Sequence, residues 1–341
     1  MAGWKASAKD AVRRMQEAGA EVFFDPETHA LQTPAVGDWR YYDEWDLWPA
    51  AGRRLDTDAH KQEHLRRVFG VQDDLGVPRL APTILLHSAQ STSSTQALEL
   101  AHLAIDADPR CVLAIVGDGT FWAAGSALDA HIGALAQLEP AGWWLTVARP
   151  LAILPASAVP SEIHGLCRTA RALSEDAPVH ISHGDLAGLP AISAGAATLG
   201  TGWDPRQRVS AYASYAARDP DAEGGSWFGQ VTLEGVLSLL VGSEIRVLAD
   251  RAPALAAAML PGTVPPGPKE AWEHHARLLH QLVQELDVTA AGAYDRLRDR
   301  YLAARAQWPS VASAVGVANG VDAWVTPLLD GLEAFGRTEG F

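Results

Sequence analysis

The chain has 341 residues, of which 48 % are hydrophobic, and its formal net charge is −14. This charge argues against nucleic acid as a partner, because affinity for nucleic acid comes largely from positive side chains that neutralise phosphates. The sequence contains no run of about 18 apolar residues that would span a membrane, and its N-terminus has no apolar core of the secretory type. The two cysteines, Cys111 and Cys167, form no CxxC pair. We therefore expect a globular protein of the reducing cytoplasm.

The first 80 residues form an irregular region. A strand is predicted at residues 21–24, directly before Asp25 and Pro26. An aromatic stretch follows at residues 39–45, and a charged helix is predicted near residues 58–69.

From residue 81 to 217 one pattern recurs, in which a short apolar run precedes a polar or glycine-rich turn and an amphipathic helix. Runs that are apolar on both faces are typical of a parallel sheet covered on both sides. Such alternation forms right-handed βαβ units, in either a closed (β/α)8 barrel or an open doubly wound sheet. The predicted strands are residues 83–87, 112–116, 143–147, 179–182 and 198–201, and the predicted helices include 95–103 and 128–138.

A (β/α)8-type (TIM) barrel is the favoured fold class. No GxGxxG motif follows the first strand, which removes the most common reason to choose a dinucleotide-binding sheet. The stretch HISHGDLAGLPAISAGAATLGTGWD, residues 180–204, resembles the closing seventh and eighth units of phosphate-binding TIM barrels. Six strands are recognisable, so either the two remaining barrel strands lie in the irregular first 80 residues or the barrel is irregular or incomplete.

The pattern changes after residue 225. Amphipathic helices are predicted at residues 232–250, 269–286, 290–308 and 322–335, and residues 261–268 (PGTVPPGP) form a linker. We therefore divide the chain into a barrel domain, residues 1–225, and an all-helical region, residues 226–341. This region either caps the barrel or joins the subunits of a homo-oligomer. Helical spacing predicts one buried stripe that contains Tyr294, Leu297, Tyr301 and Trp308.

Polar residues follow almost every predicted strand, and in parallel α/β folds the loops at these strand ends build the active site. The strand at residues 179–182 leads into His183-Gly184-Asp185, which aims an imidazole and a carboxylate at the barrel mouth, while Gly184 allows close approach of a ligand. The alternative is that Asp185 caps the next helix and His183 bonds a neighbouring strand. The residues expected at the mouth are Asp25, His87, Gln90, Asp118, Arg149, His183, Asp185, Thr201, Trp203, Asp204 and Arg206.

Two further stretches carry candidate chemistry. In VGDGTFW, residues 116–122, Asp118 is either a general acid or base or an ordinary turn residue. In GTGWDPRQR, residues 200–208, the backbone N–H groups of Gly200, Thr201 and Gly202 favour an anion, with forked donors from Arg206 and Arg208. The alternative there is a helix that Asp204 caps, and a carboxylate at that place would repel a phosphate.

The spacing of histidines and lysines argues against metal and Schiff-base chemistry. No HxH ends the first strand, and His274 and His275 lie on a predicted helix without the HExxH arrangement. None of the four lysines falls at a strand end. Neither a metal nor another cofactor is predicted.

The layout from Leu135 to Arg208 is similar to the last third of the tRNA-guanine transglycosylases, which are also TIM barrels. This resemblance implies base exchange by a nucleophilic aspartate at a strand end. This chain has Gly200-Thr201 at the corresponding place, and it lacks the zinc cysteines of that family.

The sequence thus predicts a barrel enzyme that binds a small, anionic and partly aromatic ligand, with acid–base chemistry from Asp118, His183 and Asp185. A transglycosylase-like base-exchange protein is one alternative. A non-catalytic barrel that serves as a binding or assembly module is the other.

Overall fold

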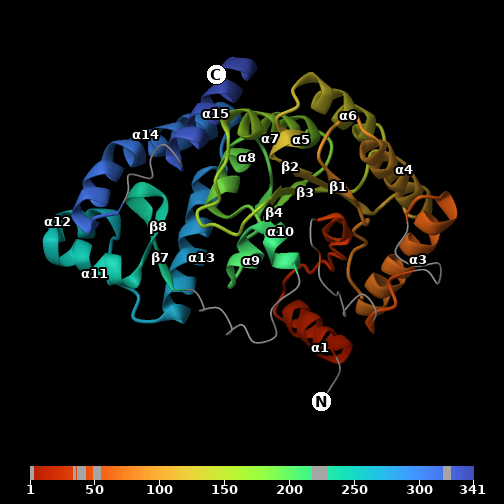
Figure 1. The fold of residues 1–341 in the computed structure, drawn as a ribbon, viewed down its shortest axis with the longest axis horizontal. Helices are drawn as coiled ribbons and strands as arrows, with labels where there is room; N and C mark the ends of the chain where they lie inside the picture. Colours follow the sequence, from red (N-terminus) through yellow and green to blue (C-terminus); the bar gives the residue numbers. More distant parts are fainter. Residues whose placement is uncertain (1–3, 34–35, 37–43, 49–54, 217–228, 318–323) are drawn as a thin grey trace.

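The computed structural model describes residues 4–33, 36, 44–48, 55–216, 229–317 and 324–341. A row of helices covers the outer face of a central parallel sheet. These helices continue into a helical C-terminal region (Figure 1). The mixed α/β class, the parallel sheet and the C-terminal helices are therefore as predicted.

The strands of the sheet lie side by side in chain order, β1-β2-β3-β4-β5, and all pair in parallel. A short sixth strand, β6, pairs with the C-terminal end of β3, where Arg149 lies opposite Ala211. The strands are β1 (Leu85–Leu86), β2 (Val112–Asp118), β3 (Gly142–Arg149), β4 (Val179–Ser182), β5 (Thr198–Leu199) and β6 (Ser210–Ala211).

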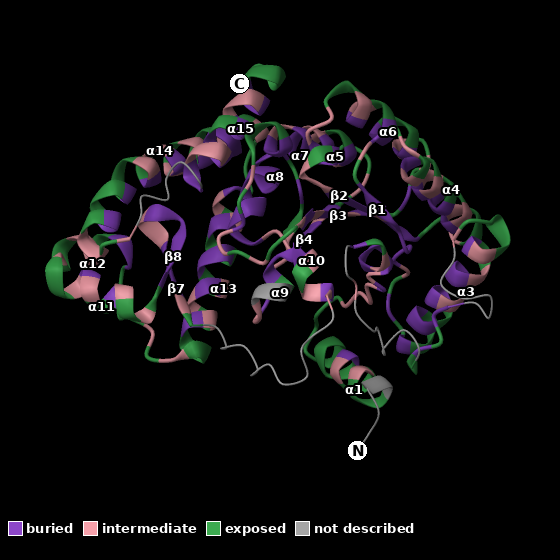
Figure 2. Ribbon diagram, in the orientation of Figure 1, coloured by how far each residue is buried: buried purple, intermediate pink, exposed green. Residues whose placement is uncertain are grey.

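Side-chain alternation gives this sheet two different faces. The outer face carries Leu113, Ile115 and Leu145, which belong to the main hydrophobic core. This core also includes residues of the helices that follow β1 to β4, and strands β1 to β4 are largely buried whereas the outward faces of the helices are exposed (Figure 2). These helices are α4 (Thr92–Ala107), α5 (Gly119–Trp122), α6 (Ser126–Ala136), α7 (Pro160–Leu173), η2 (Asp185–Gly188) and α8 (Leu189–Ser193).

The inner face of the sheet is more polar, because the register aligns Thr146 with Ser182, and Trp144 with His180. Segments from elsewhere in the chain cover this face. Phe23 packs on Trp144 and His180, with ring centroids 5.4 and 5.8 Å apart. The other covering elements are η1 (Thr28–Gln32), α9 (Pro205–Arg208) and α10 (Tyr212–Tyr215).

The sheet of the described residues is not closed, so the (β/α)8 barrel predicted from the sequence is not what they form. The edge strands β1 and β5 each pair with one neighbour, and no strand joins them. The two expected additional strands do not appear among the described residues of the first 80, which form α1 (Trp4–Glu17), η1 and α3 (Asp58–Leu75). Residues 21–24 are not a strand, because Phe23 packs its ring on the sheet instead of pairing its backbone with an edge.

The C-terminal region is mainly helical, but the helix predicted at residues 232–250 is wrong. Its first half forms an antiparallel hairpin in which Gln230 pairs with Val241, and Leu237 turns the chain with a φ of 46°. The hairpin consists of β7 (Gln230–Leu233), η3 (Glu234–Val236) and β8 (Ser238–Val241). The helices are α11 (Gly242–Arg251), α12 (Pro253–Met259), α13 (Pro268–Glu285), α14 (Ala290–Val315) and α15 (Val325–Glu339).

The C-terminal helices pack on the helices that cover the sheet. Helix α15 contacts α7, and α14 contacts α8 (Figure 1). The predicted stripe is confirmed, because Tyr294, Leu297, Tyr301 and Trp308 are all buried in α14. One continuous hydrophobic cluster includes residues from both sides of residue 225. None of the described helices combines the length and apolar character needed to cross a lipid bilayer.

Candidate functional site

Polar side chains gather at the C-terminal edge of the sheet. His87 follows β1, Asp118 ends β2, Arg149 ends β3 and His183 follows β4. Because these strands are parallel, their carboxyl ends meet at one edge, as the sequence pattern predicts. Two separate groups of side chains form there, an open cleft beside β1 to β3 and a deeper cluster beside β4.

The cleft has a volume of about 700 Å³. It lies between the ends of β1 to β3, the start of α5, the loop before α7 and α10. Its lining residues are His87, Ser88, Asp118, Gly119, Thr120, Ala123, Ala124, Ala148, Arg149, Pro150, Val159, Glu162 and Tyr212.

A histidine and an aspartate are hydrogen-bonded within the cleft. Nδ1 of His87 lies 2.5 Å from Oδ2 of Asp118. The other carboxylate oxygen, Oδ1, accepts the backbone N–H groups of Thr120 and Phe121 at 2.9 and 3.0 Å and so caps α5. The cap holds the carboxylate in place, and the His87 side chain, 54 % exposed, presents its ring to the cleft. Asp118 therefore caps a helix and also orients an imidazole, while its expected role as a general acid or base stays a prediction.

Tyr212 packs beside this pair from α10. Its ring lies edge-on to the His87 ring, with centroids 6.5 Å apart, and contacts the apolar cluster of Leu85, Val116 and Ala148. Burial, together with the negative charge of Asp118, raises the pKa of Tyr212 to about 12. The phenol therefore stays protonated and neutral at physiological pH.

Arg149 and Glu162 form a buried pair at the back of the cleft. Nη1 of Arg149 donates to Oε2 of Glu162 at 2.5 Å, and Nη2 donates to Oε1. Glu162 lies in the first turn of α7, where the helix dipole favours a carboxylate. A Cβ on Gly119 would lie 2.8 Å from Oε2 of Glu162, so the glycine after Asp118 makes room for this pair. Because Glu162 already neutralises Arg149, this arginine adds no net positive charge for an anionic ligand.

The deeper cluster, which we call the inner cluster, consists of Asp25, Glu27, His29, His183 and Tyr215. Nε2 of His183 lies 4.0 Å from Oε1 of Glu27, and the Tyr215 hydroxyl donates to the same oxygen at 3.4 Å. Oδ1 of Asp25 accepts the backbone N–H of Glu27 at 2.7 Å. Glu27 and His183 both have positive φ, 48° and 52°. A residue with a Cβ is strained at positive φ, and such strain is common at functional sites.

Burial sets the protonation of the inner cluster. It raises the pKa of Glu27 to about 8, with a further contribution from the charge of Asp25. Burial lowers the pKa of His183 to about 4, and burial together with the nearby His183 lowers that of His29 to about 3. The side chains of Glu27 and His183 nevertheless remain 29 % and 17 % exposed. The cluster is therefore deep but open to solvent.

Asp185 belongs to neither group, because it lies in a buried network of its own. Its carboxylate accepts hydrogen bonds from Nε and Nη2 of Arg208 at 2.6 and 3.1 Å and from the Thr201 hydroxyl at 2.7 Å. Nε2 of His275, on α13, lies 3.1 Å from the same carboxylate. Burial alone would raise the pKa of Asp185, but His275 and Arg208 outweigh it and hold this pKa well below its usual range. These contacts favour a structural role that links the sheet edge to the C-terminal region.

The glycine at 184 is required by packing. A Cβ at that position would lie 2.6 Å from Leu199 and 2.7 Å from Ile181, so it would meet the sheet rather than a ligand.

Of the donors expected to hold an anion, the backbone N–H of Gly200 and the Arg208 guanidinium are used within the protein. The backbone N–H of Gly200 donates to Ile181 at 2.6 Å, and the N–H groups of Trp203 and Asp204 donate to Oε1 of Gln207 at 2.9 and 3.2 Å. A Cβ on Gly202 would lie 2.0 Å from Gln207. An anion site at the N–H groups of Thr201 and Gly202 stays a prediction.

Two other residues of this segment also differ from expectation. The Trp203 ring packs on Trp272 of α13, with centroids 5.9 Å apart, rather than on an open surface. Arg206 lies in α9, and its side chain is outside the described residues.

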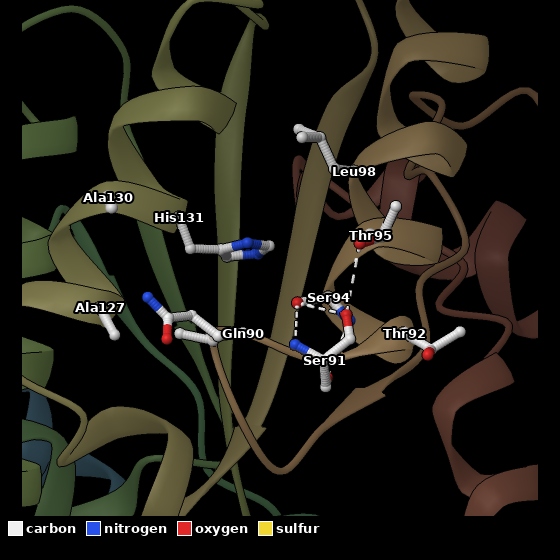
Figure 3. Close-up of a pocket in the computed structure, with 10 residues that line it drawn as sticks. Gln90, Ser91, Thr92, Ser94, Thr95, Leu98, Ala127, Ala130 and His131 are labelled. Carbon is white, nitrogen blue, oxygen red and sulfur yellow. Dashed lines mark hydrogen bonds between the residues drawn. The ribbon is translucent and has the colours of Figure 1, made fainter.

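Gln90 lies away from both groups, in a groove of about 660 Å³ between α4 and α6 (Figure 3). On one side of this groove, Ser91 and Ser94 form a capping box at the N-terminus of α4. His131 of α6 lies on the other side (Figure 3).

Several residues of the site were missed by the sequence pattern. Glu27 and His29 follow Asp25 within DPETH, so the spacing of acidic and imidazole groups was a signal that could have been read. Glu162, Tyr212 and Tyr215 carried no such signal, because they reach the site only through the placement of α7 and α10.

Within the described part of the chain, no three His, Cys, Asp or Glu side chains are arranged to hold a metal ion. Comparisons with models of protein families, with curated proteins and with solved structures found no match for this chain.

Proposed function

We propose that this protein is an enzyme, a hydrolase that uses His87 as its general base on a small ligand held in the cleft. The observation that carries the proposal is the 2.5 Å contact between His87 and Asp118 in an open cleft of about 700 Å³. A carboxylate that accepts a hydrogen bond from the N–H of one ring nitrogen favours the tautomer in which the other ring nitrogen is unprotonated. That second nitrogen can then accept a proton.

The proposed reaction begins with a water molecule in the cleft. Nε2 of His87 accepts a proton from this water, whose oxygen attacks the ligand, and Asp118 stabilises the imidazolium that results. The water oxygen thereby forms a bond to the carbonyl carbon of the ligand, the bond from that carbon to the leaving group breaks, and the imidazolium gives its proton to the departing group. Neutral Tyr212 adds no competing charge beside the carboxylate, and the helix cap holds Asp118 still.

The lining of the cleft favours a neutral ligand over the anionic one expected from the sequence. Asp118 and Glu162 contribute two carboxylates against the single guanidinium of Arg149. Val159 and Pro150 border the cleft on the side of the loop before α7, where Leu151 and Ile153 are 58 % and 53 % exposed. This apolar border suits a hydrocarbon or aromatic part of the ligand.

The test is turnover of neutral 4-nitrophenyl esters and anilides by the wild type and by His87→Gln. General base catalysis contributes on the order of 10²–10⁴ in rate, so kcat should fall at least about 100-fold while the melting temperature stays unchanged. The matched control is His60→Gln, since His60 of α3 forms a similar pair with Asp56, which precedes that helix, at 2.8 Å and outside the cleft. Equal turnover by His87→Gln and the wild type refutes the assignment. A ligand that binds in the cleft without being turned over would instead support a non-catalytic binding module.

A further inference from the structure

The inner cluster contains two carboxylates and, among the described residues, no Lys or Arg within ion-pair distance of either. Asp25 accepts hydrogen bonds from the backbone N–H of Glu27, at 2.7 Å, and from the side chain of Trp144. For Glu27 the contacts are Tyr215 at 3.4 Å and His183 at 4.0 Å. Elsewhere at this edge of the sheet the buried carboxylates have arginine partners, Arg149 for Glu162 and Arg208 for Asp185.

A second observation indicates that the cluster is incomplete. His29 is 2 % exposed, and its Nε2 has no hydrogen-bond partner among the described residues. Its ring lies edge-on to Tyr215, with centroids 5.9 Å apart, and is close enough to His183 to influence its own pKa. Buried polar atoms in native proteins usually have a partner, and an unsatisfied one calls for an unseen group.

We propose that the inner cluster is a binding site for a cationic organic group, an amidinium or ammonium, held by Asp25 and Glu27. The forked N–H donors of an amidinium match carboxylate oxygens, as those of arginine do. The aromatic ring of Tyr215 beside Glu27 suits a delocalised cation. No ligand set for a metal is present among the described residues, which favours an organic cation over a metal ion.

This site is separate from the cleft and does not depend on the function proposed for it. Helix α10 supplies Tyr212 to the cleft and Tyr215 to the inner cluster. Because Tyr212 and Tyr215 lie three residues apart on one face of α10, a cation bound by Asp25 and Glu27 would lie about one helical turn from Tyr212.

The first test is calorimetric titration of the full-length protein with benzamidine, with benzamide as the neutral isostere and benzoate as the anionic one. Benzamidine should bind at least tenfold more tightly than either. Glu27→Gln and Asp25→Asn should each weaken its binding at least tenfold, whereas Glu139→Gln, an exposed carboxylate before β3, should leave it unchanged. Equal affinity for benzamidine and benzamide would overturn the proposal, and so would binding of Zn²⁺ but not of benzamidine. Loss of benzamidine binding in Asp118→Asn alone would place the cation in the cleft and would also overturn it.

A second measurement needs only the wild type and so remains decisive if a variant fails to fold. The titratable groups that face Glu27 are Asp25, His183 and Tyr215. Burial and Asp25 raise the pKa of Glu27 to about 8, so Glu27 must lose a proton when it pairs with a cation at pH 7. Titrations in buffers of different ionisation enthalpy should therefore show proton release at pH 7 and much less at pH 9. Binding without proton release at pH 7 would show that Glu27 does not hold the cation.

Discussion

Replacing Asp185 with Asn distinguishes a structural residue from a catalytic one. The Asp185 side chain is 3 % exposed, and the side chain of its partner, Arg208, is 1 % exposed. The substitution keeps the shape of the side chain but leaves the Arg208 guanidinium without its counter-charge in the interior. Breaking one partner of a buried ion pair costs about 3–5 kcal/mol, a large part of the roughly 5–15 kcal/mol that stabilises a typical protein.

His183→Ala provides the matched comparison two residues earlier. His183 makes one hydrogen bond, to the Ser182 hydroxyl at 2.6 Å, and its side chain is 17 % exposed. Loss of such a bond costs about 1 kcal/mol. Asp185→Asn should therefore lower the free energy of unfolding by about 2–4 kcal/mol more than His183→Ala does.

Urea denaturation followed by tryptophan fluorescence and by far-ultraviolet circular dichroism measures both losses, provided that the two probes give one transition with a common slope. If Asp185→Asn costs less than about 1 kcal/mol and abolishes turnover, Asp185 acts in the reaction and its structural assignment is wrong.

Two further outcomes are expected from the same denaturation assay. The folded protein keeps a proton on Glu27 up to about pH 8, whereas the ordinary value is 4.5. Stability should therefore fall by up to about 1.4 kcal/mol per unit as the pH rises from 6.5 to 8, and a Glu27→Gln variant that falls equally would contradict this. Gly165→Ala should lower the free energy of unfolding by about 1–3 kcal/mol, because its Cβ would lie 1.9 Å from the Trp122 carbonyl oxygen. A Cβ on Gly133 would have nothing within 4 Å, so Gly133→Ala should be neutral or stabilising by up to about 1 kcal/mol. Equal effects of the two glycine substitutions would show that α7 can move away from α5.

Local patterns in the sequence were sufficient to find most of the elements. Apolar runs predicted the parallel strands that became β2, β3 and β4, and helical spacing predicted α4, α6, α13 and the buried stripe of α14. These features depend on periods of two and of 3.6 residues, which the chain carries without reference to distant segments. For the same reason, residues after parallel strands, such as His87 and Asp118, could be placed at one edge.

The failure at residues 232–250 has a local and a distant cause. Thr232 and Leu239 occupy positions that also fit an amphipathic helix, but they pair across the hairpin of β7 and β8. His275 of α13 accepts or donates a hydrogen bond at the Thr232 hydroxyl, 2.8 Å away, which helps to hold that strand. The apolar spacing within one segment cannot reveal a partner that lies 43 residues further along the chain.

Closure of the sheet and the roles of the site residues were decided only by the tertiary structure. Whether β1 and β5 meet depends on what fills the inner face, and Phe23 with its neighbours fills it where two more strands were expected. Asp185 has the same residue type and strand-end position as a catalytic group, yet Arg208 and His275 reach it from 23 and 90 residues away and bury it. The sequence by itself determined which polar groups lie at the strand ends. Long-range contacts then decided which of them stay paired inside the protein and which, like His87, remain open to the cleft, because burial and charge depend on neighbours that are distant in the chain.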